Sequence, residues 1–558
     1  MERHRFGLVF GALVAAVSIL GACGGDDGTT RTSDDISNVE IDDQRGQAVV
    51  TIVMTDNVFT PQNVRVDPGT KVVWENKGRA AHNLRAFAED GFGVGFGSPT
   101  SVLVDDTYEF TFASEGVFRY WCSLHGSNVT GMVGAVVVGD ASLDATPDDA
   151  EVPQASGNLR VPQDYATIQD AVNAAVPGAL VLVDKGVYNE AVTVDVGHEN
   201  ITIRGVDRNE TIVDGEFEDD KANGFTVLAD GVAIENLTAR NFTTNAFFWT
   251  GVDGYRGSYL NSYRTGDYGV YAFDSVNGQF DHTYAAGSAD AGFYIGQCYP
   301  CNAVITDSIA EWNGLGYSGT NAGGNLLILN SIWRFNRAGI VPNSGTGETL
   351  YPERETTIVG NLVYANSNPD TPAIEIAETA IGNGVLLAGA TKNIVERNLV
   401  YDHDISGIAA IPLPEKVLNP DDPEAIDFDA LDNRVVGNVI ENSRVADLLN
   451  VRNITDAADP GGNCYSGNEF TTSLPADIET LLPCDANGSG TYAAPITEFV
   501  ARFTETKPDG VDYKTAAIPA MPLGENMADP QNAPAVPAGG GNVPMAVDLA
   551  AITVPTKP

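Results

Sequence analysis

The chain has 558 residues, which is more than one hydrophobic core ordinarily serves, so we expect two or more domains. Its formal net charge is −44, from 75 acidic residues against 31 lysines and arginines. Nucleic acids and anionic membrane surfaces repel such a charge, and this excludes both as partners for the bare protein surface. The hydrophobic fraction of 43% and the 59 glycines favour a folded, turn-rich, mostly β protein.

The first 23 residues predict an export signal. Arg3 and Arg5 precede an apolar run, from residue 8 to residue 20, that is too short for a comfortable membrane span. The run ends in Leu20-Gly21-Ala22-Cys23, which resembles a bacterial lipobox. That resemblance implies cleavage before Cys23 and a lipid on this cysteine, with a plain secretory peptide as the alternative. We expect a protein of the cell envelope, touching a membrane only through the lipid anchor, or a periplasmic or extracellular one.

Residues 24–45 are rich in aspartate and predict an acidic, solvated tether. Residues 46–140 then carry short β-branched and aromatic runs separated by turn signals such as Pro68-Gly69. The runs predict strands over residues 48–54, 64–66, 71–75, 108–113, 118–121 and 134–138. Short strands at such close spacing indicate a β-sandwich.

Soft and borderline metal ligands gather near the end of this domain. Cys122, His125 and Met132 lie within eleven residues, and His82 offers a second imidazole from a distant strand. A thiolate, two imidazoles and a weak axial thioether are the set that suits a blue-copper centre. A single thiolate with a thioether is a poor set for zinc. We expect Cys122, His125 and Met132 on one loop between two strands, with His82 on another.

The same stretch resembles plastocyanin- and azurin-type cupredoxins. The resemblance rests on Phe59-Thr60-Pro61-Gln62-Asn63-Val64-Arg65-Val66, Pro68-Gly69-Thr70-Lys71-Val72-Val73-Trp74, Ala81-His82-Asn83 and the Cys122 loop. It implies a Greek-key sandwich with one type 1 copper ion on His82, Cys122, His125 and Met132. It also implies electron transfer to a redox partner protein through the edge of His125. Asn83 would connect the two ligand loops by hydrogen bonding.

Cysteine counting supports this assignment. With Cys23 set aside, five of the six cysteines remain, and an odd number in an exported protein points to one thiol with another task. Cys298 and Cys301 are close neighbours, and Cys464 and Cys484 bracket a short loop. Two disulfides would leave Cys122 for the metal.

Residues 141–158 are rich in Asp, Ala and Pro and predict a linker. A helix with its apolar residues on one face follows within residues 165–175, and Thr167 with Asp170 forms a possible capping box. From about residue 230 a loose repeat of roughly 23 to 46 residues predicts a parallel β-helix whose recurring polar side chains stack as a ladder. The recurring residues are Asn236, Asn261, Asp307, Asn330, Asn361, Asn398 and Asn438.

Residues 166–172 and Gly186-Val187-Tyr188 resemble the right-handed β-helix superfamily of pectate lyases, mannuronan epimerases and periplasmic copper-maturation factors. The resemblance implies the fold and leaves the activity open, because this scaffold carries many functions. We therefore expect an all-β chain: a sandwich, then a β-helix over residues 159–484 that includes the Cys464–Cys484 loop. Residues 485–558 are rich in Pro, Ala and Gly and predict an irregular or disordered tail.

Three groups of residues on the β-helix could carry chemistry. They are Asp267, Asp274, Asp281 and Asp290 with His282 and Arg264; the box Tyr401-Asp402-His403-Asp404; and Trp249, Tyr255, Tyr263, Tyr268, Trp312 and Trp333 as a glycan-binding groove. Acidic corner residues are ordinary in a chain of this charge, and many of the aromatic residues could equally be core stacks. We assign no catalytic residue.

The leading hypothesis is an exported, lipid-anchored blue-copper electron carrier whose β-helix is a scaffold for docking or for a polysaccharide. A second hypothesis makes the β-helix a polysaccharide lyase or epimerase with copper as an accessory. A third makes the chain a copper-delivery factor.

Overall fold

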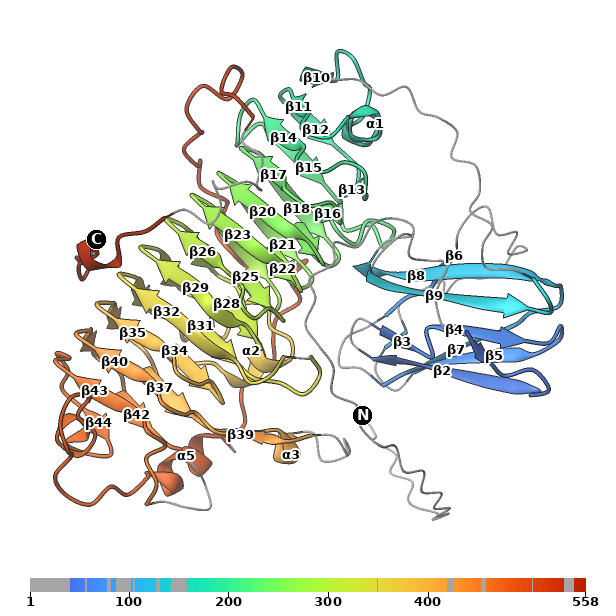
Figure 1. Cartoon of the computed structure of the whole chain (residues 1–558). Helices are drawn as coiled ribbons and strands as arrows, with labels where there is room; N and C mark the ends of the chain where they lie inside the picture. The colour runs from blue at the N-terminus through green and yellow to red at the C-terminus, as the bar shows by residue number, and fades with distance from the viewer. Residues whose placement is uncertain are drawn as a thin grey trace. The chain divides into compact units, whose positions relative to one another are not determined.

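The computed structural model describes residues 41–55, 58–77, 82–86, 102–103, 106–126, 131–141, 158–348, 350–418, 425–452, 458–503, 505–535 and 546–558 (Figure 1). Cys23, the tether up to residue 40 and most of the linker lie outside these residues. The regular structure of the described residues is mostly strand, which confirms the predicted all-β class. No helix among them has the length and apolar character to cross a bilayer.

The N-terminal domain is a sandwich of two sheets, with strand orders β1-β4-β9-β8-β6 and β3-β2-β5-β7. The bounds are β1 (Asp42–Asp43), β2 (Val49–Thr55), β3 (Val58–Thr60), β4 (Asn63–Val66), β5 (Lys71–Asn76), β6 (Arg85–Ala86), β7 (Thr107–Thr111), β8 (Gly116–Gly126) and β9 (Gly131–Val138). All six predicted strands are present. The sandwich also begins earlier than expected. The strand β1 lies within the predicted tether, and it pairs with β4.

Alternation along the strands builds the core of the sandwich. Val50, Ile52 and Met54 are the buried residues of β2, at every second position, and Val72 and Trp74 do the same on β5. Period-two burial is what a strand with one face on a core requires. The ring of Trp74 makes an edge contact with Tyr120 at 5.3 Å between centroids, so the two sheets meet through aromatic side chains.

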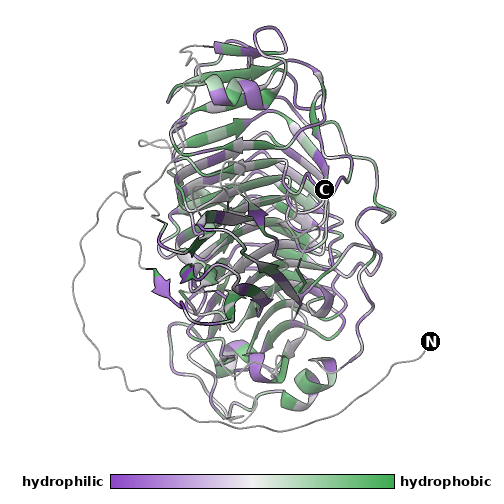
Figure 2. Ribbon diagram, turned by 90° about the vertical axis from the view of Figure 1, so that its right-hand side faces the viewer, coloured by the Kyte–Doolittle hydropathy of each residue, from purple (hydrophilic) through white to green (hydrophobic). Residues whose placement is uncertain are grey.

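Residues from 158 onward form a β-helix of three parallel sheets, here called face 1, face 2 and face 3, with apolar residues along the strands (Figures 1 and 2). Face 1 contains β10 (Asn158–Val161), β11 (Leu180–Val183), β14 (Thr202–Gly205), β17 (Val232–Glu235), β20 (Asp253–Ser258), β23 (Val276–Asp281), β26 (Ala303–Thr306), β29 (Gly323–Leu329), β32 (Arg354–Val359), β35 (Ile394–Glu396), β40 (Arg434–Val436) and β43 (Cys464–Ser466). Face 2 contains β12 (Gly186–Tyr188), β15 (Thr211–Asp214), β18 (Thr238–Phe242), β21 (Asn261–Thr265), β24 (Tyr284–Ser288), β27 (Ile309–Glu311), β30 (Ile332–Arg334), β33 (Leu362–Tyr364), β36 (Leu399–Tyr401) and β41 (Val439–Glu441). Face 3 contains β13 (Val192–Val194), β16 (Phe225–Val227), β19 (Phe247–Thr250), β22 (Val270–Phe273), β25 (Ala291–Gly296), β28 (Leu315–Thr320), β31 (Ala338–Asn343), β34 (Asn383–Ala388), β37 (Ser406–Ile411), β42 (Ala446–Asn450) and β44 (Ser473–Leu474).

The corner between faces 1 and 2 carries the predicted polar ladder. Nδ2 of Asn361 donates to Oδ1 of Asn398 at 3.1 Å, and Nδ2 of Asn398 donates to Oδ1 of Asn438 at 2.9 Å. The predicted register is wrong for the earlier coils. Asn236 and Asn330 lie one position earlier, at the corner itself, with φ of 56° and 45°. Asparagine tolerates that left-handed conformation, so the same residue type serves two adjacent positions for two different reasons.

A second ladder explains the Tyr401-Asp402-His403-Asp404 box. Nδ2 of Asn336 donates to Asn366, and Nδ2 of Asn366 donates to Nε2 of His403 at 3.4 Å. His403 is buried, whereas Asp402 and Asp404 are exposed. The box therefore divides between the interior and the surface, and it forms no common site.

The first coil is closed by α1 (Ile168–Ala174), which buries Ile168 and Val172 in the β-helix core. Oγ1 of Thr167 accepts the backbone N–H of Asp170 at 3.0 Å, as the capping pattern predicts. The remaining elements are short: α2 (Ile376–Thr379), β38 (Leu413–Pro414), α3 (Glu415–Leu418), β39 (Asp427–Phe428), α4 (Ile478–Leu481), α5 (Ile496–Phe503) and η3 (Leu549–Ala551).

The described part of the C-terminal tail is irregular but attached to the β-helix. Nη2 of Arg337 donates to the carbonyl of Pro508 at 2.6 Å, and Nη1 of Arg264 donates to the carbonyl of Tyr513 at 2.9 Å. Further along, Ile552 packs against Val304 and Leu329. An irregular backbone leaves its carbonyls without ladder partners, so arginine side chains can satisfy them. The described residues of the tail are thus held in place and are not disordered.

Substitution of one ladder asparagine tests the polar ladder. Oδ1 of Asn398 accepts from both the backbone and the side chain of Asn361, and its own amide group bonds to Asn438 and to the Ile358 carbonyl. We expect Asn398→Ala to lower the free energy of unfolding by about 3 kcal/mol, because buried donors and acceptors lose their partners. Urea denaturation followed by circular dichroism measures this. The exposed Asn532→Ala is the control, and equal midpoints for the two variants would contradict the ladder.

His403 should make the protein sensitive to acid. Burial lowers the pKa of His403 from its ordinary value to about 3, so the folded chain holds this imidazole neutral. Its stabilising contribution is complete above pH 6.5 and is lost as the pH falls toward 3, at about 1.4 kcal/mol per pH unit. We expect His403→Asn to reduce the loss of thermal stability between pH 7 and pH 4. Identical pH profiles for the variant and the parent would show that His403 does not titrate in this way.

Candidate functional site

An offset in the pairing of β8 and β9 creates the candidate metal site. Trp121 pairs with Val133 and Gly126 pairs with Gly131, so five residue steps on β8 face two steps on β9. The three additional residues give β8 a bulge, a feature that proteins use beside functional sites. Cys122 and Met132 lie where the offset begins. The prediction of a single ligand loop is therefore wrong: Cys122 and His125 belong to β8, and Met132 belongs to β9.

His82 reaches the site from another segment. Its backbone N–H donates to the carbonyl of Val102 at 3.1 Å, and the N–H of Val102 donates to the carbonyl of His82 at 2.6 Å. A few residues later β6 pairs with β8, with Arg85 opposite Trp121. These pairings bring the imidazole of His82 to the thiol, with 3.7 Å between Nδ1 of His82 and Sγ of Cys122.

The backbone of Asn83 gives the Cys122 sulfur a polar contact inside a buried environment. The backbone N–H of Asn83 donates to Sγ of Cys122 at 3.4 Å, and such a donor stabilises negative charge on the sulfur. His82, Cys122 and Met132 are each fully buried, and the latter two belong to the apolar core of the sandwich. Asn83 therefore links the two ligand segments, although through its backbone.

The donor set fits a copper ion. For metal–nitrogen and metal–sulfur distances of about 2.0 and 2.3 Å, two ligands in a trigonal plane place their donor atoms about 3.7 Å apart. The observed separation of Nδ1 and Sγ is 3.7 Å. The side chain of His125 lies outside the described residues, and no three His, Cys, Asp or Glu side chains cluster as metal ligands within them. The structure thus brings the imidazole of His82 to the thiol of Cys122, and it places Met132 in the same buried core as Cys122.

The other cysteines are joined in pairs. Disulfides connect Cys298 with Cys301 and Cys464 with Cys484, with Cα atoms 4.8 and 4.7 Å apart. Cys122 stands outside both bonds and is buried. This distribution matches the one inferred from the odd number of cysteines.

Two of the four β-helix aspartates meet beside face 3. Asp267 and Asp290 precede β22 and β25 on successive coils, and the Tyr268 hydroxyl donates to Oδ2 of Asp290 at 2.9 Å. Burial raises the pKa of both carboxyls, and the neighbouring charge of Asp290 raises that of Asp267 further. Oδ1 of Asp290 has no hydrogen-bond partner among the described residues. Burial and the like charge thus favour the protonated form of these two carboxyls.

The other members of that group lie elsewhere. Asp281 belongs to a buried network in which His282 approaches it at 2.9 Å and Arg256 at 3.8 Å. Burial alone would raise the pKa of Asp281, but the bonds from His282 and Ser258 bring it below its usual value. Asp274 is an exposed corner residue with φ of 48°, and Arg264 is bonded to the tail.

The predicted aromatic groove is not formed. Trp249, Tyr255 and Trp333 point into the β-helix and are fully buried in its core. The other three are half-buried on the outside but separate: Tyr263 donates to the tail carbonyl of Pro519, Tyr268 bonds to Asp290, and Trp312 packs on Phe335. Aromatic residues in strands serve cores as readily as surfaces, and the alternation decides which.

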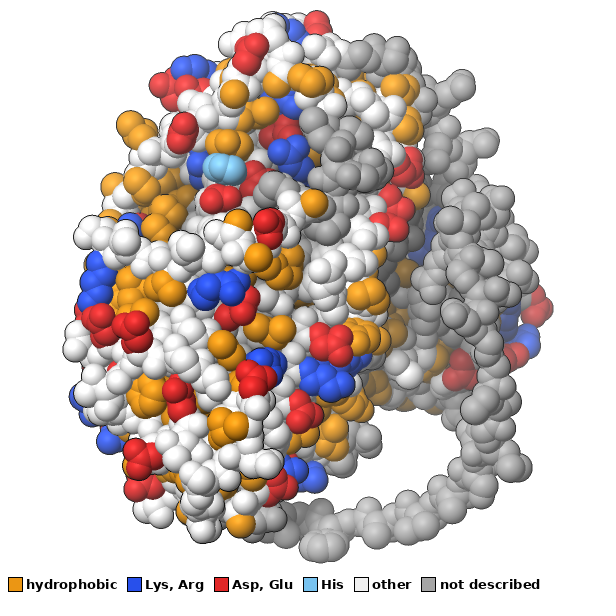
Figure 3. Space-filling view, turned by 60° about the vertical axis from the view of Figure 1, so that its left-hand side comes forward, with side chains coloured by type: hydrophobic (Ala, Val, Ile, Leu, Met, Phe, Trp, Pro, Cys, Tyr) orange, Lys and Arg blue, Asp and Glu red, His pale blue; other side chains and the backbone are white. Residues whose placement is uncertain are grey.

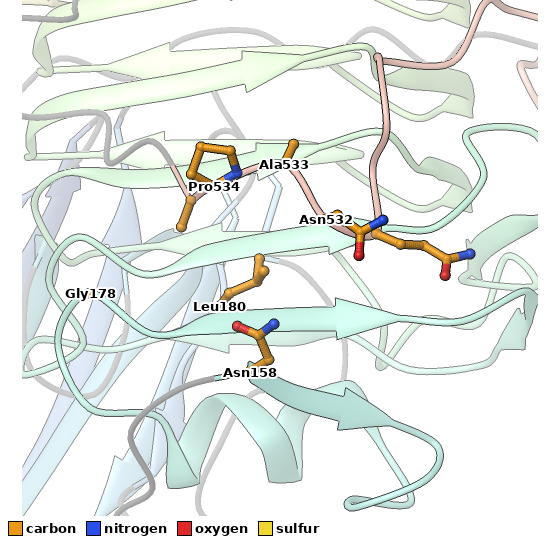
Figure 4. Close-up of a pocket in the computed structure, with 8 residues that line it drawn as sticks. Asn158, Gly178, Leu180, Asn532, Ala533 and Pro534 are labelled. Carbon is orange, nitrogen blue, oxygen red and sulfur yellow. The ribbon is translucent and has the colours of Figure 1, made fainter.

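A cavity of about 320 Å³ lies where the tail crosses the first strands of face 1 (Figure 4). Asn158, Leu180, Asn532 and Pro534 are among its lining residues, and none of the eight is acidic, basic or a thiol. It therefore offers no acid–base or metal chemistry. On the face drawn in Figure 3, acidic and basic side chains are interspersed.

Two residues of the site were missed from the sequence. Val102 holds the backbone of His82, and Nδ2 of Asn76 donates to the carbonyl of Val102 at 2.9 Å. Val102 had no motif around it that could have revealed this role. Asn76 offered one weak signal, because it is a polar residue at an inward position of β5.

Two family models match the chain: "Copper binding proteins, plastocyanin/azurin family" over residues 47–139 and "Right handed beta helix region" over residues 245–412. Halocyanin of Natronomonas pharaonis is 33% identical over 166 residues, covering 25% of this chain and 98% of halocyanin. Plastocyanin of Sambucus nigra is 32% identical over 88 residues, covering 14% of this chain and 86% of plastocyanin.

Among solved structures, the A-module of a mannuronan C-5 epimerase of Azotobacter vinelandii aligns with 14% identity and a TM-score of 0.41, covering 57% of this chain and 93% of that module. The two family matches place a cupredoxin domain before a right-handed parallel β-helix. Through the first of these domains the chain belongs to the plastocyanin/azurin family of copper-binding proteins.

Proposed function

We propose that this protein is an exported blue-copper protein that carries single electrons. The observation that carries the proposal is the buried His82–Cys122 pair, whose donor atoms lie 3.7 Å apart with Met132 in the same core. Copper held by a thiolate, two imidazoles and an axial thioether supplies one-electron redox chemistry with little change of geometry. His82, Cys122, His125 and Met132 would hold one such ion.

The residues around the site support this use. The N–H of Asn83 stabilises charge on the Cys122 sulfur, and the paired backbones of His82 and Val102 fix the imidazole. Burial excludes water from the His82 and Cys122 side chains, which favours electron transfer over the binding of a substrate at the metal. A redox partner protein would receive the electron at the edge of His125.

Location and anchoring complete the proposal. The lipobox-like sequence around Cys23 supports a lipid anchor on the outer side of a bacterial membrane, and the charge of −44 leaves that anchor as the membrane contact. The β-helix would be a scaffold for docking or for a polysaccharide. A copper-delivery role is the alternative that metal handover to an apo-enzyme would reveal.

The cluster of Asp267, Tyr268 and Asp290 favours a second candidate function for the β-helix. Lyases and epimerases that act on uronate polymers need a proton donor and acceptor beside the sugar, and the half-buried hydroxyl of Tyr268, bonded to the buried carboxyl of Asp290, can serve. Copper would then be an accessory of a polysaccharide-modifying protein.

Colour tests the copper site. Oxidised, copper-loaded protein should absorb strongly in the visible red with one copper per chain, and Cys122→Ser should abolish the band because the thiolate is lost. Absorption spectroscopy with metal analysis measures both. A variant in which Cys298 and Cys301 are both replaced by serine is the control and should keep its colour. Colour that survives Cys122→Ser would end the assignment.

Asp290→Asn tests the carboxylate cluster. Because the pKa of Asp290 is raised in the folded chain, the parent protein should lose stability as the pH rises from 4 toward neutrality. The variant should be more stable than the parent at pH 8, and this difference should shrink at pH 4. Thermal unfolding at both values measures this.

The same variant tests the second function. If Asp290 transfers protons, Asp290→Asn should lose any formation of double bonds or epimers on a uronate polymer, while Asp274→Asn should retain it. A parent protein inactive on such polymers would remove this candidate and leave the copper proposal untouched.

A further inference from the structure

The backbone of His82 makes one of its contacts outside the regular sheets. His82 and Val102 form an isolated antiparallel bridge with two hydrogen bonds, of 3.1 and 2.6 Å. Neither residue belongs to a strand. Whatever fixes Val102 therefore contributes to the position of the His82 backbone and its imidazole.

Asn76 fixes Val102 to the sandwich. Asn76 is the last residue of β5, is fully buried, and its Nδ2 donates to the carbonyl of Val102 at 2.9 Å. That carbonyl also accepts the N–H of His82, so both lone pairs of one oxygen are used. In addition, the backbone N–H of Asn76 donates to the carbonyl of Asp106 at 3.0 Å.

The residue type at this position has a physical reason. Val72, Trp74 and Asn76 are the buried, inward residues of β5, and the first two are apolar. A third apolar residue would suit this buried position equally well. However, it could not donate a hydrogen bond to the Val102 carbonyl, which would then keep only the bond from the N–H of His82. β5 is itself paired on both sides, with β2 and β7, so it is a firm base for this contact.

We infer that Asn76 is a positioning residue for the metal site, acting on His82 through Val102; the inference rests on the proposed copper function. The chain of contacts runs from β5 through Nδ2 of Asn76 to the Val102 carbonyl, and from there to the backbone of His82. It ends at the 3.7 Å separation between the imidazole and the Cys122 sulfur. Asn76 thereby sets the geometry of the nitrogen–sulfur pair without touching the metal.

Hydrogen exchange on the copper-free full chain tests whether Asn76 holds the bridge between His82 and Val102. In Asn76→Leu, which keeps the approximate size, the amides of His82 and Val102 should exchange about ten-fold faster, the effect of losing one buried hydrogen bond. Asn63→Leu is the matched control, since Asn63 is a buried asparagine on β4 of the same domain. If Asn76→Leu does not fold, Asn76→Asp replaces it, because an ionised carboxylate keeps the shape but cannot donate.

Spectroscopy of the copper-loaded full chain tests whether Asn76 affects the metal site. The visible band and the reduction potential should shift in Asn76→Leu and stay at the parent values in Asn63→Leu. A coloured parent whose Asn76 variants show unchanged amide exchange, band and potential would overturn the inference. A colourless parent would refute the copper proposal instead, and the exchange rates would still decide whether Asn76 holds His82.

Discussion

The offset between β8 and β9 is the constraint on which the metal site depends. Paired strands keep a fixed register, and three additional residues on one strand can be accommodated only by a bulge. The bulge begins at Cys122, directly where β6 brings the His82 segment alongside β8. One irregularity in an otherwise regular sandwich thus lies beside the contact between the Cys122 thiol and the His82 imidazole, with Met132 on the facing strand.

The β-helix solves a related problem by repetition. Each coil turns a corner where backbone and side-chain groups lose their ladder partners, and the next coil supplies them. Along one edge of the β-helix these hydrogen bonds are made by Asn361, Asn398 and Asn438. Along another edge they are made by Asn336, Asn366 and His403. Polar residues inside such a stack stabilise it only while each neighbour is present, because a buried amide without a partner is costly.

Chemistry was predictable from the sequence where it demands particular residue types in a particular order. The residues around His82 and Cys122 predicted the family of copper-binding proteins that the chain belongs to, and Thr167 with Asp170 predicted the helix cap. Positions that depend on three-dimensional neighbours were not predictable. The ladder register was misplaced for Asn236 and Asn330 because two adjacent corner positions both accept asparagine. The aromatic groove failed because composition does not say which side of a strand faces the core.

The net charge of the chain also could not predict positions that depend on three-dimensional neighbours. A net charge of −44 describes the field that a partner meets at a distance, and that field repels anionic surfaces. It does not say where the few cations lie. Arg208, Arg264 and Arg337 form no ion pair among the described residues and donate to backbone carbonyls, including those of Glu525, Tyr513 and Pro508 in the tail. In a chain with more than twice as many acidic as basic residues, these guanidinium groups are used to hold an irregular segment. Their role follows from unsatisfied carbonyls and not from the balance of charge.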